Sequence, residues 1–448
     1  MEHHFRYSHG SLGFAYFSNY YCVWSNMDQT NQQPDRCKRC DHNNFGFVRL
    51  QKKDIYCRQC LQDYCIHRFR STVGKSHQIK YDENVLVAVS GGWSSLALAD
   101  MVFKGRIIES DQHRKIKYMP SFLHLDDRSG SDSTLTKEFF RFLIRSKIPC
   151  HFATISSIFD PECSTKYFSI NESDEIDIHW QNYTDFISET KKSSSFHKIL
   201  FDRIENIKDD DIISDFTAKL KHSAIVRAAI DFGFKKIMVG NTLDLQTIDL
   251  MNNVINGSGY GIYDNVNFCD NRFKAVLVLR PLYELSKKAI LFYLINEKLL
   301  NLACKRKIPS RNANIRSNIR IVTEMFLNQL SETFPSTYFT IFKTGNKISH
   351  NSTDEVDGVD DESKAGNEIG KMNRCKFCLI KIDQNGPERK YNALDAYQLS
   401  SNLSIGIDAS IDHYKSSPNI DYCQSCSRIR LVLDPDNEKI FAKLDFNF

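Results

Sequence analysis

Four Cys-x-x-Cys pairs are the strongest chemical signal in this sequence of 448 residues. They are Cys37/Cys40, Cys57/Cys60, Cys375/Cys378 and Cys423/Cys426. Thiolates suit a soft, tetrahedral cation, and two pairs joined by a loop have the spacing of a four-thiolate zinc ribbon. The sequence therefore predicts one zinc site from the first two pairs and, across a longer loop, a second from the last two. An iron–sulfur cluster or a redox pair is the alternative.

A second chemical signal is Val89-Ser90-Gly91-Gly92-Trp93-Ser94-Ser95, which follows a continuous apolar run from residue 84. Glycines after a buried strand let the backbone turn sharply, and the N–H groups of the next helix can cradle a phosphate. The alternative is a tight turn with a serine cap. The strand–turn–helix context favours a loop of phosphate-binding ancestry.

Alternating strands and helices must position this loop. Strands are expected at residues 84–90, 120–126, 148–155, 236–240 and 275–280, with helices at 94–103, 216–232 and 284–299. Apolar runs that alternate with helices predict an α/β fold with a doubly wound parallel sheet. The acidic stretch at residues 171–211 breaks this pattern and is interpreted as an insertion.

Changes in composition divide the chain further. We expect an unassigned extension at residues 1–26, a zinc-ribbon and basic segment at 27–80, the α/β domain at 82–345 and a Cys-rich module at 372–448. Residues 351–362 hold six acids and no Lys or Arg, which indicates an acidic flexible linker at 346–371. Met27 is an alternative start.

The overall composition narrows the class of protein. The formal net charge is only +4, so any nucleic-acid surface must be a local patch. No apolar run is long enough to span a bilayer, and residues 1–26 lack the pattern of a secretory signal. A long chain whose 14 cysteines are not densely packed is unlike a secreted disulfide scaffold. We therefore expect a cytoplasmic protein.

Two basic stretches are candidates for contact with RNA phosphates. The first follows the second Cys pair, and the second is rich in Asn and Ser, with no acid between residues 305 and 320. Plain solvated surface is the alternative for both. The candidates are Arg68, Arg70 and Lys75, and Lys305, Arg306, Lys307, Arg311, Arg316 and Arg320.

The glycine loop resembles the pyrophosphate loop of the N-type ATP pyrophosphatases, whose pattern is Ser-Gly-Gly-x-Asp-Ser. A second pattern of those enzymes, Gly-His-Asn-x-Asp-Asp-x-x-x-Thr, is similar to residues 240–247, where the Gly and one Asp match. The resemblance assigns Ser90, Gly91, Gly92, Ser94, Ser95 and Asp244 to a remnant of this site.

The departures from this pattern remove chemistry. Ser94 stands where the enzymes carry an aspartate, and Asn241 and Leu245 replace a His and a second Asp. Carboxylates beside a triphosphate hold Mg²⁺, so the resemblance implies a degenerate site in which ATP binding is doubtful and no residue is assigned as catalytic. Thiolating members also carry a Cys pair before the second pattern, whereas this chain has no cysteine between Cys163 and Cys269.

The stretch Ile66-His67-Arg68-Phe69-Arg70-Ser71-Thr72-Val73-Gly74-Lys75 carries the resemblance to one family. It is similar to the His-Lys-Phe-Arg-x-x-Leu-Gly-Lys stretch of the cytoplasmic tRNA 2-thiolation protein 2 family. That family joins this stretch to a degenerate Ser-Gly-Gly loop and to Cys-x-x-Cys pairs near its carboxyl end.

This resemblance implies a subunit of the complex that places sulfur on C2 of the wobble uridine in Lys, Glu and Gln tRNAs. It implies a heterodimer with a catalytic paralogue, contact with tRNA, and sulfur supplied by a thiocarboxylated ubiquitin-like carrier. Two alternatives stay open. One is a self-sufficient ATP-dependent tRNA-modifying enzyme in which Asp126, Asp127 or Asp244 replaces the lost metal ligands. The other is a zinc-dependent RNA-binding adaptor with no role in thiolation.

Overall fold

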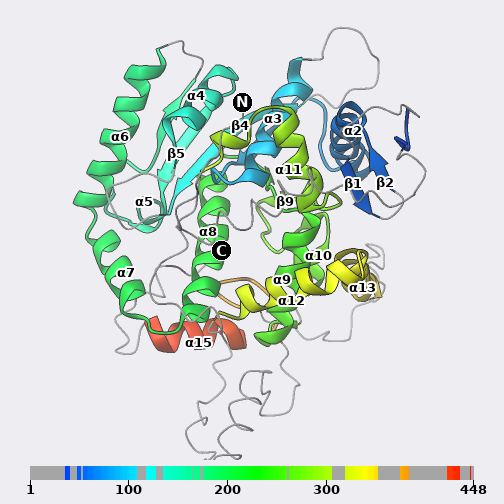
Figure 1. Ribbon diagram of the computed structural model, residues 1–448. Helices are drawn as coiled ribbons and strands as arrows, with labels where there is room; N and C mark the ends of the chain where they lie inside the picture. Colours follow the sequence, from blue (N-terminus) through cyan, green and yellow to red (C-terminus); the bar gives the residue numbers. More distant parts are fainter. Residues whose placement is uncertain are drawn as a thin grey trace, which may run out of the picture. The chain divides into compact units, whose positions relative to one another are not determined.

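The computed structural model describes residues 36–40, 48–51, 54–107, 118–127, 135–163, 165–171, 175–259, 262–304, 318–351, 374–382, 421–433 and 444 (Figure 1). The chain separates into two compact units, Met1–Asp63 and Tyr64–Phe448. The expected extension at residues 1–26 lies outside the described residues. Among the described helices, none has both the length and the apolar character needed to cross a membrane.

The first unit contains a small antiparallel hairpin. Strand β1 (Val48–Gln51) pairs with β2 (Asp54–Tyr56), with Val48 opposite Tyr56. Helix α2 (Arg58–Ser76) begins two residues after β2 and continues into the second unit. Cys37 and Cys40 precede the hairpin, and Cys57 and Cys60 lie at the start of α2. A strand pair followed by a helix therefore carries the first two Cys pairs.

A seven-stranded mixed sheet forms the centre of the second unit, in the order β6-β5-β4-β3-β7-β9-β8. The expected parallel sheet is confirmed by its five inner strands: β5 (Cys150–Thr154), β4 (Tyr118–Asp126), β3 (Glu83–Ala88), β7 (Lys236–Met238) and β9 (Leu277–Leu279). The antiparallel edge strands, β6 (Phe168–Ile170) and β8 (Cys269–Asp270), had not been expected. They are too short to leave a periodic signal in the sequence.

Helices follow most strands and cover the sheet (Figure 1). Where two helices are close in sequence, serine and threonine caps mark the boundary; for example, Ser194 accepts a hydrogen bond from His197 N at the start of α7. The helices are α3 (Trp93–Ile107), α4 (Lys137–Arg145), α5 (Ile155–Phe159), α6 (Ile176–Ser193), α7 (Ser195–Asn206), α8 (Asp210–Asp231), α9 (Leu243–Ile255), α10 (Ile262–Val266), α11 (Lys287–Asn296), the 3-10 turn η2 (Leu300–Leu302), α12 (Ile319–Thr333), α13 (Thr337–Asn351) and α15 (Gln424–Leu433).

The stretch at residues 171–211, expected as an insertion, forms α6, α7 and the start of α8. An aromatic cluster anchors α6, because the ring of Tyr183 lies 5.0 Å from that of Phe152 on β5 and 5.5 Å from that of Phe140 on α4. This segment therefore covers part of the sheet. Helix α13 runs to Asn351, past the expected start of the acidic linker at 346, and its buried Phe342 and Gly345 pack against α9.

One face of the sheet shares a hydrophobic core with α8 and with the last two Cys pairs. Leu86 and Ala88 of β3 belong to this core, and the alternation of side chains along a strand directs Val85 and Val87 to the other face. Phe216 of α8 and Phe377 of the third Cys pair also belong to it, with ring centroids 6.1 Å apart. The segment with the last two Cys pairs is thus packed onto the α/β domain by a continuous apolar interior.

Candidate functional site

The Ser-Gly-Gly loop lies at the point where the strand order of the sheet reverses. From β3 the chain builds outward through β4 and β5, and later returns to the other side of β3 as β7 and β9. Ligands of open α/β sheets bind outside the carboxyl ends of the strands at such a reversal. The loop at residues 90–92 follows β3, and Gly240 follows β7, so both candidate motifs meet there.

Close contacts hold the loop in one conformation. Gly91 has φ +82°, a value that favours glycine, and its carbonyl accepts a hydrogen bond of 2.8 Å from Cys304 N. A Cβ on Gly91 would lie 2.7 Å from Cys304 Sγ. Ser90 Oγ donates to Ser95 Oγ at 3.2 Å, and Ser95 Oγ donates to Gly92 O at 2.9 Å. The hydroxyl of Ser95 therefore closes the turn, and Cys304 packs against the first glycine.

Gly240 brings β7 against the first turn of α3. A Cβ on Gly240 would lie 3.0 Å from Ser95 N and 3.1 Å from the carbonyl carbon and oxygen of Ser94. These are backbone atoms of a helix start, which cannot move aside as a flexible side chain can. Glycine at this position therefore permits the close contact between the two motifs.

We expect Gly240→Ala to lower the free energy of unfolding by about 1–3 kcal/mol, because the new methyl group overpacks this contact. Gly105→Ala is the matched control, because Gly105 lies on α3 with no heavy atom within 4 Å of an added Cβ. There, alanine should raise the free energy of unfolding by about 0.5–1 kcal/mol. Denaturant unfolding of the full chain measures both, and equal stabilisation by both substitutions would contradict the contact.

The carboxylates near the loop are held by other groups. Asp126, at the end of β4, forms a buried ion pair of 2.7 Å with Lys191 of α6. Asp127 is ion-paired with Lys221 of α8. Asp244 accepts a hydrogen bond of 2.5 Å from Lys287 N at the start of α11, and burial raises the pKa of its carboxyl. Each carboxylate considered as a replacement metal ligand thus stabilises a neighbouring element.

His124 of β4 lies next to the loop and was missed by the sequence analysis. Its Nδ1 donates to Val89 O at 2.7 Å, and burial lowers the pKa of the imidazole, which favours the neutral ring. A histidine inside an apolar strand gives no functional signal in the sequence. Lys191 was missed for a different reason, because it lies in the stretch interpreted as an insertion.

The first two Cys pairs come together as a four-sulfur cluster. The Sγ atoms of Cys37, Cys40, Cys57 and Cys60 all lie within 4.8 Å of one another, and that of Cys40 lies 3.7 Å from that of Cys57. Burial raises the pKa of Cys37, but hydrogen bonds from backbone N–H groups, among them that of Cys57 at 3.4 Å, outweigh it and lower the pKa to about 6. The pKa of Cys57 is raised instead, chiefly by burial, so the neighbouring thiols of the cluster do not all favour the thiolate.

The last two Cys pairs form a second four-sulfur cluster, which is more deeply buried. The four Sγ atoms again lie within 4.8 Å of one another, and that of Cys378 lies 3.6 Å from that of Cys423. Backbone bonds join the two knuckles, since Lys376 N donates to Asp421 O at 2.9 Å. Helix α15 begins directly after Cys423.

The donor set and spacing of both clusters fit a tetrahedral metal ion. With a Zn–S bond of about 2.3 Å, the sulfurs of a tetrahedral site lie about 3.8 Å apart. None of the described cysteines is in a disulfide. Among the described residues, these two clusters are the groups of three or more metal-ligating side chains close enough to share an ion. The described residues at the Ser-Gly-Gly loop provide no such group.

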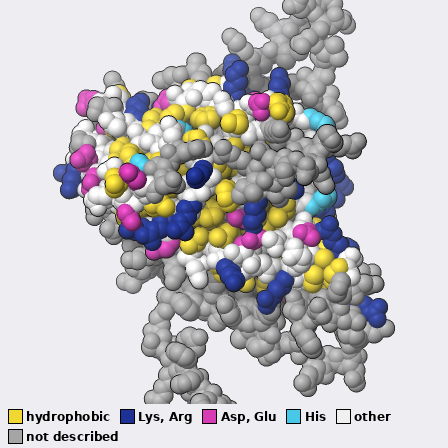
Figure 2. Space-filling model, turned by 90° about the horizontal axis from the view of Figure 1, so that it is seen from above, with side chains coloured by type: hydrophobic (Ala, Val, Ile, Leu, Met, Phe, Trp, Pro, Cys, Tyr) yellow, Lys and Arg dark blue, Asp and Glu magenta, His cyan; other side chains and the backbone are white. Residues whose placement is uncertain are grey.

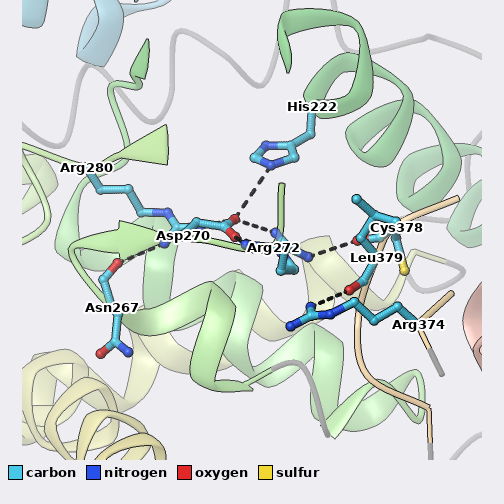
Figure 3. A network of polar contacts seen from close by, with 8 residues as sticks. All are labelled: His222, Asn267, Asp270, Arg272, Arg280, Arg374, Cys378 and Leu379. Carbon is cyan, nitrogen blue, oxygen red and sulfur yellow. Dashed lines mark hydrogen bonds and ion pairs between the residues drawn. The ribbon is translucent and has the colours of Figure 1, made fainter. Parts of the chain in front are cut away.

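A buried charge network joins the sheet edge to the second cluster (Figure 3). The carboxylate of Asp270 on β8 accepts bonds from Arg272 at 2.6 and 2.9 Å and from Arg280 at 3.0 Å. Arg272 Nη1 also donates to Cys378 O at 3.4 Å. Burial and the two guanidinium groups outweigh the attraction of Asp270 and lower the pKa of His222 to about 4, so this ring is neutral.

The predicted RNA-contacting residues divide into three groups. Arg70 and Lys75 are exposed on α2, whereas Phe69 and Val73 of the same helix are buried. Arg68 donates to Glu284 at 3.1 Å, and Arg320 of α12 is ion-paired with Asp249 of α9. Lys305, Arg306, Lys307, Arg311 and Arg316 lie outside the described residues. Figure 2 shows Lys and Arg side chains at several separate places on one face, with Asp and Glu among them.

Comparison with known proteins confirms the resemblance found in the sequence. A family model described as cytoplasmic tRNA 2-thiolation protein 2 matches residues 318–430. Cytoplasmic tRNA 2-thiolation protein 2-A of Xenopus laevis is 26% identical over 429 residues, covering 87% of this chain and 80% of the relative. Cytoplasmic tRNA 2-thiolation protein 2 of Anopheles gambiae is 23% identical, covering 86% and 85%.

A solved structure confirms the fold class. The U34-tRNA thiolase NcsA from Methanococcus maripaludis, solved with its 4Fe–4S cluster, superposes with a TM-score of 0.51. The match covers 78% of this chain and 96% of that protein at 14% sequence identity. The central sheet and its helices are thus shared with a thiolase.

Proposed function

We propose that this chain, which belongs to the cytoplasmic tRNA 2-thiolation protein 2 family, is the subunit of a wobble-uridine 2-thiolation complex that does not itself activate ATP. Its substrates would be the Lys, Glu and Gln tRNAs in the cytoplasm. Family membership supports the pathway, and the loop supports the division of labour between subunits.

The observation that carries the proposal is that the carboxylates near the loop already form ion pairs or hydrogen bonds with other groups of the chain. Activating ATP requires Mg²⁺ at the phosphates, and therefore carboxylates directed at them. Ser94 is neutral, Asp126 is paired with Lys191, and Asp244 caps α11. The same pairing argues against a self-sufficient ATP-dependent enzyme, because breaking a buried ion pair to free Asp126 is costly.

The activation of uridine by ATP would take place on a paralogous partner in a heterodimer. There the uridine O2 would attack ATP, releasing pyrophosphate and leaving an adenylated oxygen. The thiocarboxylate sulfur of a ubiquitin-like carrier would then attack C2 and displace AMP, and water would cleave the bond between that sulfur and the carrier's carbonyl carbon, leaving 2-thiouridine and a carboxylate on the carrier. In this chain, Cys304 is the thiol packed against the loop, and among the described residues it belongs to no group of three or more metal-ligating side chains that could hold a cluster.

We further propose that zinc occupies both cysteine clusters. Cys37, Cys40, Cys57 and Cys60 would hold one ion, and Cys375, Cys378, Cys423 and Cys426 the other. Zinc bound by four protein ligands has no open position, so it would supply a structural cross-link.

Contact with tRNA is proposed for the exposed cations of α2. Arg70 and Lys75 have no ion pair among the described residues. Arg68, in contrast, is ion-paired with Glu284, and Arg320 is ion-paired with Asp249. The basic run at residues 305–316 remains a candidate from sequence.

The proposal is tested by mass spectrometry of tRNA nucleosides from cells that lack this chain. We expect wobble 2-thiouridine to disappear and to return with the wild-type gene. A variant with Arg70→Glu and Lys75→Glu should restore it only partly. Its purified complex should bind tRNA more weakly, and the dependence of log Kd on log salt should lose about two units of slope. Lys192→Glu, a charge reversal at an exposed site on α6, is the control.

Two outcomes would contradict the proposal. Normal 2-thiouridine in cells without the chain would favour an adaptor with no role in thiolation. Robust ATP–pyrophosphate exchange by the purified chain alone would favour the self-sufficient enzyme.

A further inference from the structure

Lys219 of α8 lies beside the second cysteine cluster. Its Nζ is 2.6 Å from Asp215 Oδ2, one turn earlier on the same helix. The same ammonium donates to the hydroxyl of Ser425, which lies between Cys423 and Cys426. The hydroxyl in turn donates to the carboxylate of Asp215. Three side chains from α8 and α15 thus form a closed polar group at the cluster, with Lys219 only 12% exposed.

A cation at this place would stabilise a metal ion bound by the four cysteines. Four thiolates around a divalent ion carry two net negative charges, and removing charge from water is costly unless an opposite charge lies nearby. The four cysteines are at most 8% exposed, so water contributes little to offsetting this negative charge. In the first cluster, Cys40 and Cys57 are more exposed, and the neighbouring Lys38 and Arg39 are themselves more than half exposed.

The electrostatics of Lys219 agree with this arrangement. The carboxylate of Asp215, 2.6 Å from Nζ, favours the charged form of Lys219. Other cations at the cluster reach backbone carbonyls instead: Arg272 that of Cys378 and Arg374 that of Leu379.

We propose that Lys219 is a positioning residue of the second metal site: its ammonium offsets the negative charge of the metal tetrathiolate and fastens α15 to α8 through Ser425. This inference rests on the proposed metal occupancy and is independent of the role in thiolation. Metal retention at this site then depends on a residue about 160–200 positions away in the chain, which the Cys-x-x-Cys pattern does not reveal.

The test measures zinc release from the full-length protein into excess chelator, followed with a chromogenic dye. Cys57→Ser and Cys423→Ser assign the two release phases to their sites. We expect Lys219→Met to speed release from the second site by about 10- to 100-fold, the usual cost of losing an outer partner of a metal ligand. Release from the first site should not change, which makes that site an internal control.

Two further variants separate charge from packing. Lys219→Arg keeps the charge and should release zinc at close to the wild-type rate. Lys221→Met removes a charge from the same helix, but Lys221 contacts Asp127 after β4 rather than the segment of the last two Cys pairs, so wild-type release is expected. If Lys219→Met does not fold, Lys219→Gln keeps a polar donor at this position without the charge.

Wild-type release from Lys219→Met or Lys219→Gln would overturn the inference. Release from Lys219→Arg as fast as from Lys219→Met would overturn it too, because the effect would then come from packing. If Cys423→Ser leaves the zinc content unchanged, the metal assignment itself fails, which is a different result from a loaded site that is indifferent to Lys219.

Discussion

Asp270→Asn is expected to lower the free energy of unfolding of the Tyr64–Phe448 unit by about 3–5 kcal/mol, the cost of breaking a buried ion pair. Asp270 is fully buried, and its two oxygens accept from Arg272 and Arg280, which are 7% and 4% exposed. Asparagine has nearly the same shape but no charge, and its amide would direct donors at donors. The two guanidinium groups would then lose the carboxylate that they share in the interior.

Asp249→Asn is the matched control for this prediction. Asp249 also pairs with an arginine, Arg320, but the two side chains are 31% and 34% exposed. Solvent screens such a pair, so the loss should be about 1 kcal/mol or less. Denaturant unfolding with unchanged slope measures both variants. Similar losses for both would show that burial of the Asp270 network does not determine its contribution.

The largest effect is expected from Cys426→Ser, which removes a ligand from the second cluster. Structural zinc contributes about 10–16 kcal/mol to folding in small metal-dependent domains, so losing the site should cost more than an ordinary core substitution. Because the cluster shares its core with Phe216 and Leu220 of α8, the damage should extend to that helix. Hydrogen exchange should speed up at residues 374–382 and along α8.

Two cysteine substitutions serve as controls for that experiment. Cys150→Ser changes a cysteine that is 1% exposed but lies on β5 outside the clusters, so a loss of about 1–3 kcal/mol without metal loss is expected. Cys60→Ser should speed exchange in the Met1–Asp63 unit and leave α8 protected. Unchanged exchange in α8 of Cys426→Ser would show that the cluster does not support the α/β core.

Local patterns in the sequence predict local structure well in this protein. The apolar run before Ser90 is a buried parallel strand, and the spacing of the cysteines assembles two clusters of four sulfurs. The apolar run is readable because it lies within a few consecutive residues. The cysteine clusters are readable because all of their members are the same type of ligand. Edge strands of two or three residues have no such signal, and β6 and β8 were accordingly missed.

Partnerships between distant residues could not be predicted. The sequence identified Asp126 and Asp244 as the carboxylates near the loop. It did not reveal that Asp126 accepts a hydrogen bond from Lys191 and Asp244 one from the backbone N–H of Lys287. These partners lie 65 and 43 residues away, on elements whose relative placement depends on the whole sheet. For the same reason, Arg320 was predicted to contact RNA from its basic neighbours alone, without the Asp249 that pairs with it.

The shared core of α8 and α15 also imposes an order on biosynthesis. Lys219 and Ser425 are 206 residues apart, so at about 5–20 residues per second a ribosome needs about 10–40 seconds between them. During that interval the apolar side chains Phe216 and Leu220 lack the partners that cover them in the finished protein. The core around α8 is therefore expected to be completed only after residues 421–433 have left the ribosome.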